Sequence, residues 1–493
     1  MIQSRNVLLQ FDKRYPHMRS FSSAFAQIFP KNAAFYLFGA AIIIVFLGVG
    51  GCRPERFVAN ADLELRCETD TVLFDTLLVG AGSITKRFKI YNDEGRNVLI
   101  DEVYLAGRKQ SGGSAYRINI NGNPANALTE VELRARDSLY IFVEVTIDPS
   151  QQNTPFLVTD SVVFRSGNRT KAVQLVAYGQ NAVFFNEEVL DCNMVWDNTL
   201  PIVVYNSVLV DSGCTLTIRE GTRVYFNKNS SLFVLGTLRI EGTPAQPVRM
   251  RGDRLDPLYR DLAGGWNGIH LLRGSVGHRI ENLDLRNGTI GIRVDSLPAD
   301  ADSVNVIINK TRIHNCAVVG LLAYTAQIDA YNMLISNCGL YNFLGDYGGR
   351  YRFRHCTFVH LNSGFQRGYP VFGLSNRDYN NSPSPTHLEL ENSLVWGSRS
   401  NELVLDSSGS GTITTLLSYS IIQSETQRPG VQLLYTNPKF KNPSDNDFSI
   451  DTLSPAFQRG IDLRGLYGGR LQTDLIDQAR ASNPTLGALE RIE

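Results

Sequence analysis

The sequence predicts an all-β fold in two parts, a β-sandwich followed by a solenoid of short parallel strands. The 493 residues include 42 glycines and 19 prolines, which suits short strands and turns, and no long amphipathic helical pattern stands out. Between residues 63 and 180, alternating strands recur at intervals of about ten residues. After residue 198, apolar strands separated by glycine turns recur in a unit of roughly 20 to 30 residues, which is typical of a solenoid.

Residues 33–51 form an apolar run that ends directly before Cys52. Lys31 precedes this run, and small residues precede the cysteine. The pattern resembles the lipobox of bacterial lipoproteins, which implies that residues 1–51 are a signal peptide and that a lipidated Cys52 begins the mature chain. Such a chain is anchored to a membrane without spanning it. A transmembrane helix is the alternative reading, because about 19 apolar residues also suffice to cross a bilayer.

The charge balance argues against a nucleic-acid partner. The whole chain has 48 Lys and Arg against 48 Asp and Glu. Five of these basic residues and one acidic residue precede Cys52, so 43 basic and 47 acidic residues remain. A net charge near −4 provides no electrostatic footprint for DNA or RNA. We therefore expect no nucleic-acid binding, and a membrane contact through the lipid anchor.

Six cysteines remain after Cys52, and an even set in an exported protein permits disulfides. None of them has the C-x-x-C spacing of a metal site, so we predict no metal site and no cofactor. We expect Cys316 and Cys338 either to form a disulfide or to stack as buried thiols, and Cys356 to fill the core. The six residues are Cys67, Cys192, Cys214, Cys316, Cys338 and Cys356.

We expect a polar tether at 52–62 and a β-sandwich at 63–180. Segments 86–91 and 139–145 alternate with period two, so each sheet would bury one face. The order of elements resembles the abnormal-spindle/hydin type of immunoglobulin-like domain. The resemblance implies a spacer or binding module without chemistry of its own. It is carried by FDTLLVG at 74–80, FKIYN at 88–92, VTIDP at 145–149 and VQLVAYG at 173–179.

A linker is predicted at 181–197 and a solenoid at 198–435. Segment 231–243 reads SLFVLGTLRIEGT, and segment 265–271 reads GWNGIHL. These glycine-containing turns resemble the opening coils of right-handed parallel β-helix proteins of the pectate-lyase-like kind. The fold class that follows is all-β, with an immunoglobulin-like β-sandwich and then a right-handed parallel β-helix.

The later coils align on four asparagines spaced 28, 22 and 25 residues apart. Stacked coils would place each asparagine about 4.8 Å above the last, the spacing of neighbouring strands. The side-chain amides could then bond along the stack as a structural ladder. The four residues are Asn287, Asn315, Asn337 and Asn362.

Residues 436–493 are expected to form a C-terminal cap. The segment resembles the tail that closes many bacterial β-helix proteins, although Phe457-Gln458-Arg459 departs from the usual sequence there. A cap would shield the last open strands of the solenoid.

Parallel β-helices of the family that this chain resembles include polysaccharide lyases and glycoside hydrolases. A hydrolase needs two carboxylates across the glycosidic bond, and the proposed coils contain no adjacent Asp-Asp pair. A lyase needs a base together with a group that neutralises the uronate. The candidates for catalysis are Arg350, Arg352, Arg354 and His355.

Aromatic and basic residues that surround these candidates could bind an anionic sugar, because rings stack on pyranose faces and guanidiniums pair with carboxylates. The alternative is that the alternating arginines are the solvated face of one strand. The candidate ligand-binding residues are Tyr347, Tyr351, Arg367, Tyr369, Arg377 and Tyr379.

These observations together predict a lipid-anchored protein of the cell envelope, at the outer membrane and facing either the periplasm or the surface. We expect a non-catalytic binding or scaffold protein that uses one face of the β-helix to contact a glycan or an envelope protein. The alternative is a polysaccharide lyase, or another carbohydrate-active enzyme, that acts on an anionic polysaccharide.

Overall fold

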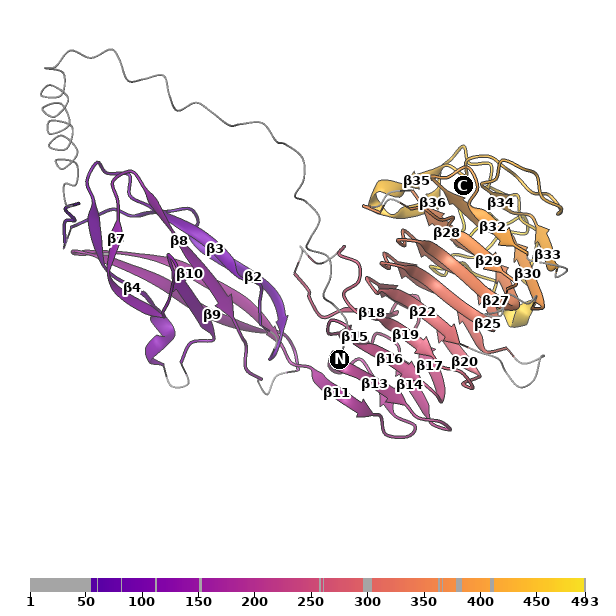
Figure 1. The fold of residues 1–493 in the computed structure, drawn as a ribbon, viewed down its shortest axis with the longest axis horizontal. Helices are drawn as coiled ribbons and strands as arrows, with labels where there is room; N and C mark the ends of the chain where they lie inside the picture. Colours follow the sequence, from indigo (N-terminus) through magenta and orange to yellow (C-terminus); the bar gives the residue numbers. More distant parts are fainter. Residues whose placement is uncertain are drawn as a thin grey trace, which may run out of the picture.

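The computed structural model describes residues 55–491 except 60, 81, 111–112, 150–152, 257–258, 260, 296–303, 362–363, 366, 378–383 and 408–411. The predicted signal peptide and Cys52 therefore lie outside the described residues. Figure 1 shows two lobes, a two-sheet sandwich and a prism of stacked strands. In the described ranges, no helix is long and apolar enough to cross a membrane.

The N-terminal lobe consists of two five-stranded sheets that enclose one apolar core. Strand β8 illustrates how each sheet contributes to this core, because alternate residues along Ser138–Val145 are buried. The pairs within each sheet are antiparallel except β2 with β10, which is parallel. The first sheet has the strand order β1 (Arg66–Cys67), β3 (Lys86–Tyr91), β8, β5 (Tyr116–Ile120) and β6 (Asn123–Pro124). The second sheet has the strand order β2 (Thr71–Leu78), β10 (Arg169–Gln180), β9 (Phe156–Ser166), β4 (Val98–Leu105) and β7 (Ala127–Leu133).

Part of the segment predicted as a tether packs onto the sandwich. Val58 forms a parallel bridge with Val98, and Ala61 is buried in the sandwich core. The backbone of Val58 is hydrogen-bonded to the sandwich and the Ala61 side chain is buried in it, so these two residues of the predicted tether belong to the lobe.

The segment predicted as a linker, 181–197, instead supplies the first coil of the solenoid. Strand β11 (Val183–Val189) pairs in parallel with β13 (Ile202–Val210), and β12 (Val195–Trp196) pairs with β14 (Thr215–Arg219). Most β11 side chains are exposed, because no further coil covers this end, and the pattern therefore looks polar and irregular. Only two residues separate β10 of the sandwich from β11.

The C-terminal lobe is one 24-stranded parallel sheet, β11 to β34, wound into a solenoid that is consistent with a β-helix. Its strands form three columns, which each coil visits in the order C, A, B. Strands β25 (Val319–Tyr331) and β27 (Tyr341–Arg354) span columns B and C.

The strands of each column pair along the solenoid axis. Column A contains β15 (Arg223–Phe226), β18 (Val248–Gly252), β21 (Leu283–Arg286), β24 (Arg312–His314), β26 (Leu334–Ser336), β28 (Thr357–His360), β31 (Leu394–Gly397) and β34 (Ile421–Ile422). Column B contains β16 (Ser231–Val234), β19 (Gly268–Leu271), β22 (Ile290–Asp295), β29 (Phe372–Ser375) and β32 (Leu403–Asp406). Column C contains β14, β17 (Thr237–Glu241), β20 (His278–Glu281), β23 (Val306–Asn309), β30 (Thr386–Glu391) and β33 (Ile413–Ser418).

The predicted asparagine ladder is formed in part. Asn287, Asn315 and Asn337 have left-handed backbone angles, with φ of 63°, 55° and 53°. They lie at the same place on successive coils, because the residues that precede them are paired in register. Asn315 Nδ2 donates to Asn287 Oδ1 at 3.0 Å, whereas Asn337 Nδ2 donates to Asn446 Oδ1 at 2.7 Å.

The fourth predicted ladder residue, Asn362, lies outside the described residues. The register places His360 on the coil above Asn337, since Ser336 pairs with Val359. The spacing of 25 residues from Asn337 to Asn362 therefore does not follow the strand register of this coil.

A second column of left-handed residues lies at the corner between columns C and A. Each member is the first residue after a column C strand, with φ between 46° and 52°. Asparagine fills only half of these positions, so no single residue type marks this corner in the sequence. The residues are Asn282, Lys310, Asn332, His355, Asn392 and Tyr419.

The cysteines divide into a disulfide and buried thiols. Cys192 and Cys214 form a disulfide between the first two coils. Cys316 and Cys338 are free and stack in the core as thiols, which was one of the two predicted outcomes. Cys356 is also buried, and burial raises its pKa to about 12, so it is no nucleophile.

The described part of the predicted cap, residues 436–491, lies along a flank of the solenoid as well as near its end, and we call it the cap. The cap includes the hairpin of β35 (Phe440–Asn442) and β36 (Asp447–Ile450) and the short 3-10 turns Pro443–Asp445 and Tyr467–Gly469. It covers the outward side of β26, β28, β31 and β34 in column A, where it packs on Leu334, Val359, Leu394, Trp396 and Ile421. The cap is drawn in yellow beside β28 and β34 in Figure 1.

Candidate functional site

The arginines proposed as catalytic lie on the outer face of column C. Along β27, Tyr351 and Phe353 point into the core, so Arg350, Arg352 and Arg354 point outward. Arg352 Nε donates to a carboxylate oxygen of Asp329 on the coil below. This alternation of inward and outward side chains is the one expected of any strand that buries one face.

Arg354 is held by two carboxylates and an aromatic ring. Its guanidinium lies 2.5 Å from Glu389 and 3.0 Å from Glu391 on the coil above, and 4.0 Å from the Tyr467 ring centroid. Only 5% of the side chain is exposed. Arg354 therefore links two coils and the cap, and it offers no free charge to a substrate.

His355 is buried beneath the cap. Asn392 Nδ2 donates to His355 Nε2 at 2.9 Å, and His355 Nδ1 lies 3.3 Å from the Gly487 carbonyl oxygen. Burial lowers the pKa of His355 well below its usual value. A ring enclosed in this way cannot reach a substrate, so His355 is a structural residue rather than the predicted base.

Two of the predicted ligand-binding residues are also structural. Tyr351 is fully buried, its ring packs against Phe343 at 5.2 Å, and its hydroxyl donates to the Gly348 carbonyl at 2.7 Å. Arg367 and Glu402 form a bidentate ion pair with side chains 1% and 0% exposed. The carboxylate also accepts backbone N–H groups, so the pair fastens a loop to column B.

Three predicted ligand-binding residues, Tyr347, Tyr369 and Arg377, are found along column B. Tyr369 is 49% exposed, Arg377 is exposed, and Tyr347 is half-buried. Tyr379, the last predicted residue, lies outside the described residues. The candidate residues are thus distributed over two faces of the prism and do not form one cluster.

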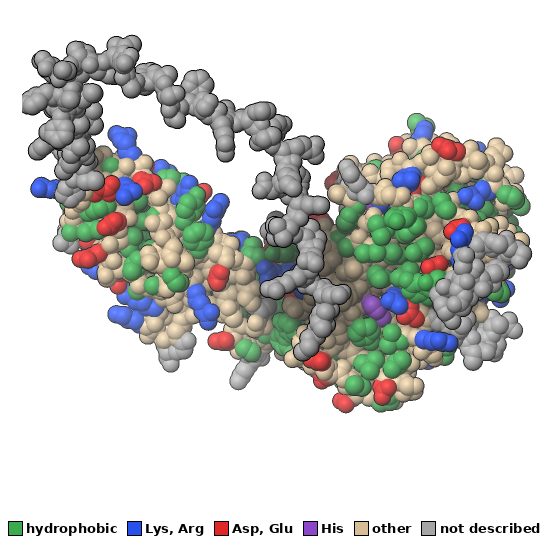
Figure 2. Space-filling view, in the orientation of Figure 1, with side chains coloured by type: hydrophobic (Ala, Val, Ile, Leu, Met, Phe, Trp, Pro, Cys, Tyr) green, Lys and Arg blue, Asp and Glu red, His purple; other side chains and the backbone are tan. Residues whose placement is uncertain are grey.

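The outer face of column B carries two pairs of tyrosine rings on neighbouring coils. Tyr324 stacks on Tyr347 with centroids 5.3 Å apart, and Tyr341 lies 5.1 Å from Tyr369. Arg293 lies 5.2 Å from the Tyr324 ring centroid. We call this surface the tyrosine face. Figure 2 shows hydrophobic side chains gathered over this part of the solenoid, where β22, β25 and β27 lie in Figure 1.

Carboxylates follow one edge of the tyrosine face. The outward row at the end of the column B strands reads Asp295, Tyr324, Asp346, Ser375, Asp406 from coil to coil. Asp295 pairs with Arg293 at 2.7 Å, and Asp406 lies 3.4 Å from Arg377. Burial raises the pKa of Asp346, and the charge of Asp406 adds to that effect.

Sequence reasoning missed Tyr324 and Tyr341, and it did not align Asp346 with the tyrosines. A signal was present, since Asp346 lies 22 residues after Tyr324, the same spacing that separates Asn315 from Asn337. Applying the asparagine spacing to every column would have aligned the tyrosines with the carboxylates.

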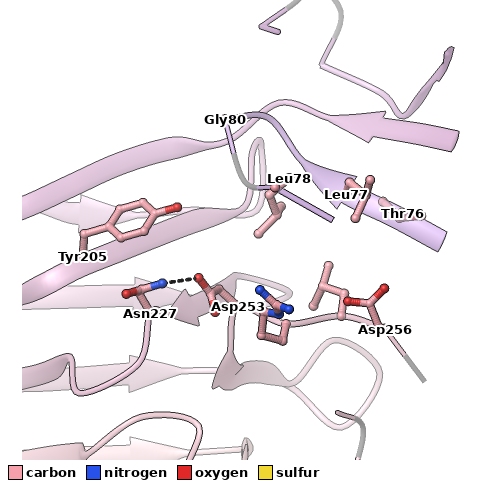
Figure 3. Close-up of a pocket in the computed structure, with 11 residues that line it drawn as sticks. Thr76, Leu77, Leu78, Gly80, Tyr205, Asn227, Asp253 and Asp256 are labelled. Atoms are coloured by element: carbon pink, nitrogen blue, oxygen red, sulfur yellow. Dashed lines mark hydrogen bonds between the residues drawn. The ribbon is translucent and has the colours of Figure 1, made fainter. Parts of the chain in front are cut away.

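A small hollow of about 160 Å³ lies where the sandwich meets the solenoid (Figure 3). The end of β2 lines one side, and Tyr205, Asn227 and Asp253 line the other. Asn227 Nδ2 donates to Asp253 at 2.7 Å, and burial raises the pKa of Asp253. The hollow is smaller than a usual ligand pocket of roughly 300–1,000 Å³. It is a junction between lobes rather than the main candidate site.

In the described parts of the chain, no group of three or more His, Cys, Asp or Glu side chains is placed to hold a metal ion. The described carboxylates of the tyrosine face are spread along a row and do not converge on one point.

No protein-family model matches the chain, and no curated protein matches it. Solved structures match about a quarter of it. A family 123 glycoside hydrolase from Clostridium perfringens is 7% identical over 24% of this chain and 26% of its own, with a TM-score of 0.17. The E. coli chaperone DraB is 11% identical over 23% of this chain and 54% of its own, with a TM-score of 0.17. The ASH/PapD-like domain of human CEP192 is 11% identical over 26% of this chain and 96% of its own, with a TM-score of 0.17. Likenesses this slight assign the chain to no family.

Proposed function

We propose that this protein is a lipid-anchored lipoprotein of the cell envelope that binds a glycan, without catalysis, through the tyrosine face. In this proposal the N-terminal lobe is an immunoglobulin-like spacer, and the solenoid is a right-handed parallel β-helix of the pectate-lyase-like kind. An envelope protein is the other class of partner that the tyrosine face would suit.

One observation carries the proposal. Three of the four groups first considered for catalysis, Arg352, Arg354 and His355, are held in ion pairs or buried. The rings of Tyr324, Tyr341 and Tyr369, in contrast, line one outer face. Aromatic rings stack on pyranose faces, and carboxylates beside them accept hydrogen bonds from sugar hydroxyls. The coil spacing of about 4.8 Å repeats this arrangement along a line, which suits a polymer.

Two features support an envelope location. The apolar run before Cys52 fits a lipoprotein signal. The Cys192–Cys214 disulfide fits an oxidising compartment, because cytosolic reductants keep most thiols reduced. The location in the cell envelope and the anchoring at the outer membrane are both proposed.

A carbohydrate-active enzyme is the second candidate, and Asp346 is the observation that favours it. Asp346 and Asp406 lie two coils apart, about 10 Å along the axis. Glycoside hydrolases that invert use carboxyl groups roughly 6.5–9.5 Å apart, one of them with a raised pKa. The raised pKa of Asp346 suits the acid of such a pair. A lyase centred on Arg352, Arg354 and His355 is disfavoured by their ion pairs and burial.

The test is a binding screen with the full chain, purified in detergent, against neutral and acidic polysaccharides. We expect Tyr369→Ala to weaken binding of the best polysaccharide. Loss of one stacking ring removes about 0.5–1.5 kcal/mol, which is roughly a two- to tenfold loss of affinity. Tyr178→Ala is the matched control, because Tyr178 is 43% exposed on the sandwich.

The same samples are assayed for new reducing ends and for unsaturated sugar. The non-catalytic proposal expects neither product. Product that forms with the natural chain and is lost in Asp346→Asn would establish the second candidate. Equal losses of binding in the Tyr369 and Tyr178 variants would reject the tyrosine face as the contact surface.

A further inference from the structure

The part of column A that the cap leaves uncovered presents a second surface, made of arginines. Strands β15, β18, β21 and β24 bury one row of side chains in the core, and the residues on either side of that row point outward. Five of those outward residues are arginines. We call this surface the arginine face, and its members are Arg223, Arg249, Arg251, Arg286 and Arg312.

The strand register aligns these arginines into two neighbouring rows. One row reads Arg223, Arg249, Asp284, Arg312 from coil to coil. The four coils span about 14 Å at the usual strand spacing. The face is therefore a short, flat strip of charge fixed by a rigid scaffold.

The second row lies beside the first and reads Tyr225, Arg251, Arg286, His314. Tyr225 adds a half-buried aromatic ring at one end of the row. His314 adds no positive charge at neutral pH, because burial lowers its pKa to about 4.

The acidic neighbours do not cancel this charge. Asp284 pairs with Arg286 at 2.6 Å, which leaves four of the five arginines without a partner inside the two rows. Asp261 lies near Arg251, and Glu281 lies on the adjoining edge of column C. The five arginines outnumber these three carboxylates, so the face keeps a net positive charge at neutral pH.

Arg251 shows that this charge is not fully compensated. Its pKa is lowered by burial and by the neighbouring Arg286, although Asp284 and Asp261 partly offset this. One of its terminal nitrogens donates to the Arg254 carbonyl at 3.1 Å, and among the described residues no acceptor lies within reach of its Nε. Arg251 has no ion-pair partner among the described residues, and a partly buried guanidinium without one is stabilised when an anion approaches it.

We propose that the arginine face binds a polysaccharide that carries carboxylate groups. Guanidinium groups pair with carboxylates through two parallel hydrogen bonds, which favours arginine over lysine for this task. The linear arrangement of Arg223, Arg249 and Arg312 suits a polymer whose anionic groups recur along its length. Tyr225 can stack on a sugar ring at the end of the strip.

Nucleic acid is the less favoured polyanion. The chain has equal numbers of acidic and basic residues, whereas nucleic-acid-binding domains are usually strongly basic. The arginine face lies on column A and the tyrosine face on column B, so the two proposals stand or fall separately.

The test uses the full chain, purified in detergent, with carboxymethyl-dextran as the probe, unmodified dextran as the neutral control and duplex DNA as the competing polyanion. We expect binding to carboxymethyl-dextran that weakens as salt rises, since added ions screen exposed charges. We expect no comparable binding to dextran. A double charge reversal, Arg249→Glu with Arg312→Glu, is expected to weaken binding at least tenfold.

The matched control reverses two exposed arginines of column C, Arg239→Glu with Arg279→Glu, and is expected to change the affinity less than twofold. Tyr178→Ala, which changes an exposed ring on the sandwich, is also expected to leave carboxymethyl-dextran binding within twofold. The thermal unfolding midpoint of each variant checks that it folds. The proposal is rejected by equal losses in both double variants, by absence of binding in the natural chain, or by tighter binding to DNA.

Discussion

Column A has two halves whose inward side chains belong to the same core. Their outward side chains differ in polarity. In the uncovered half, one outer row carries Arg249 and Arg312, and at the same register position in the covered half lie Leu334 and Leu394. The inner row stays apolar in both halves, because it always faces the core of the prism. The polarity of the outward side chains therefore depends on whether the cap covers the coil.

The covered half is joined to the cap by polar groups as well as by apolar packing. Arg480 of the cap lies 3.1 Å from Glu490, with side chains 0% and 3% exposed. It also donates to Asn332 Oδ1 at 2.7 Å, at the corner between columns C and A. In the uncovered half, the Arg286–Asp284 pair remains partly open to water, with side chains 37% and 14% exposed.

The largest expected effect comes from removing the buried arginine. Arg480→Met leaves Glu490 buried without its ion-pair partner, so we expect a loss of about 3–5 kcal/mol in the free energy of unfolding. Arg286→Met, the matched change in the uncovered half, is expected to cost about 0–1 kcal/mol. Urea denaturation measures both values. Similar costs for the two variants would mean that the cap does not make the two halves different.

A smaller effect is expected from two changes at one register position. Leu394 is 1% exposed beneath the cap, so Leu394→Ala should cost about 2–5 kcal/mol by leaving a cavity. Arg249→Ala, which alters the same outer row in the uncovered half, should change stability by no more than about 0.5 kcal/mol. Denaturant midpoints compare them, and proteolysis within 436–493 reports whether the cap has loosened in the Leu394 variant.

The smallest expected difference concerns two histidines, His355 under the cap and His314 in the uncovered half. Burial lowers the pKa of His355 well below its usual value and that of His314 to about 4. Each group thus binds its proton more readily in the unfolded chain, whose pKa is about 6.5. Its contribution to stability is complete above pH 6.5 and is lost as the pH falls toward the folded value.

At pH 5.5, His314 should have lost about 1.4 kcal/mol of stabilisation relative to pH 7.5, and His355 should lose stabilisation in the same direction. His314→Asn should flatten the pH dependence by about that amount, and His355→Asn should flatten it too, as measured by urea midpoints at the two pH values. Asparagine suits position 355, because Asn332 and Asn392 occupy the same left-handed corner. A change in only one variant would show that the two halves differ in their response to acid.

Local patterns in the sequence predicted the strands well. Segments 86–91 and 139–145 lie in β3 and β8, because alternate burial in a sandwich leaves a period of two in the sequence. Asn287, Asn315 and Asn337 were placed correctly, since a left-handed corner on every coil favours the same residue type. The second corner was missed because Lys310, His355 and Tyr419 fill it with other side chains.

Contacts between distant parts of the chain could not be predicted in this way. The arginines at 352 and 354 were identified as outward-facing candidates, yet their partners lie 23 to 37 residues away on neighbouring coils, and Tyr467 lies in the cap. One sign of the cap was available. Leu394-Val395-Trp396 is apolar on both strand faces, as expected of a strand covered on both sides, whereas Arg249-Met250-Arg251 alternates.

The join between the two lobes has a mechanical consequence. Because only two residues separate β10 from β11, a pull on the sandwich reaches the first coil with almost no slack. Solenoids unravel from their ends, where a coil has a neighbour on one side only. The Cys192–Cys214 bond ties this end coil to the next, so tension applied from the sandwich passes from Cys192 directly to Cys214 and cannot extend the residues between them.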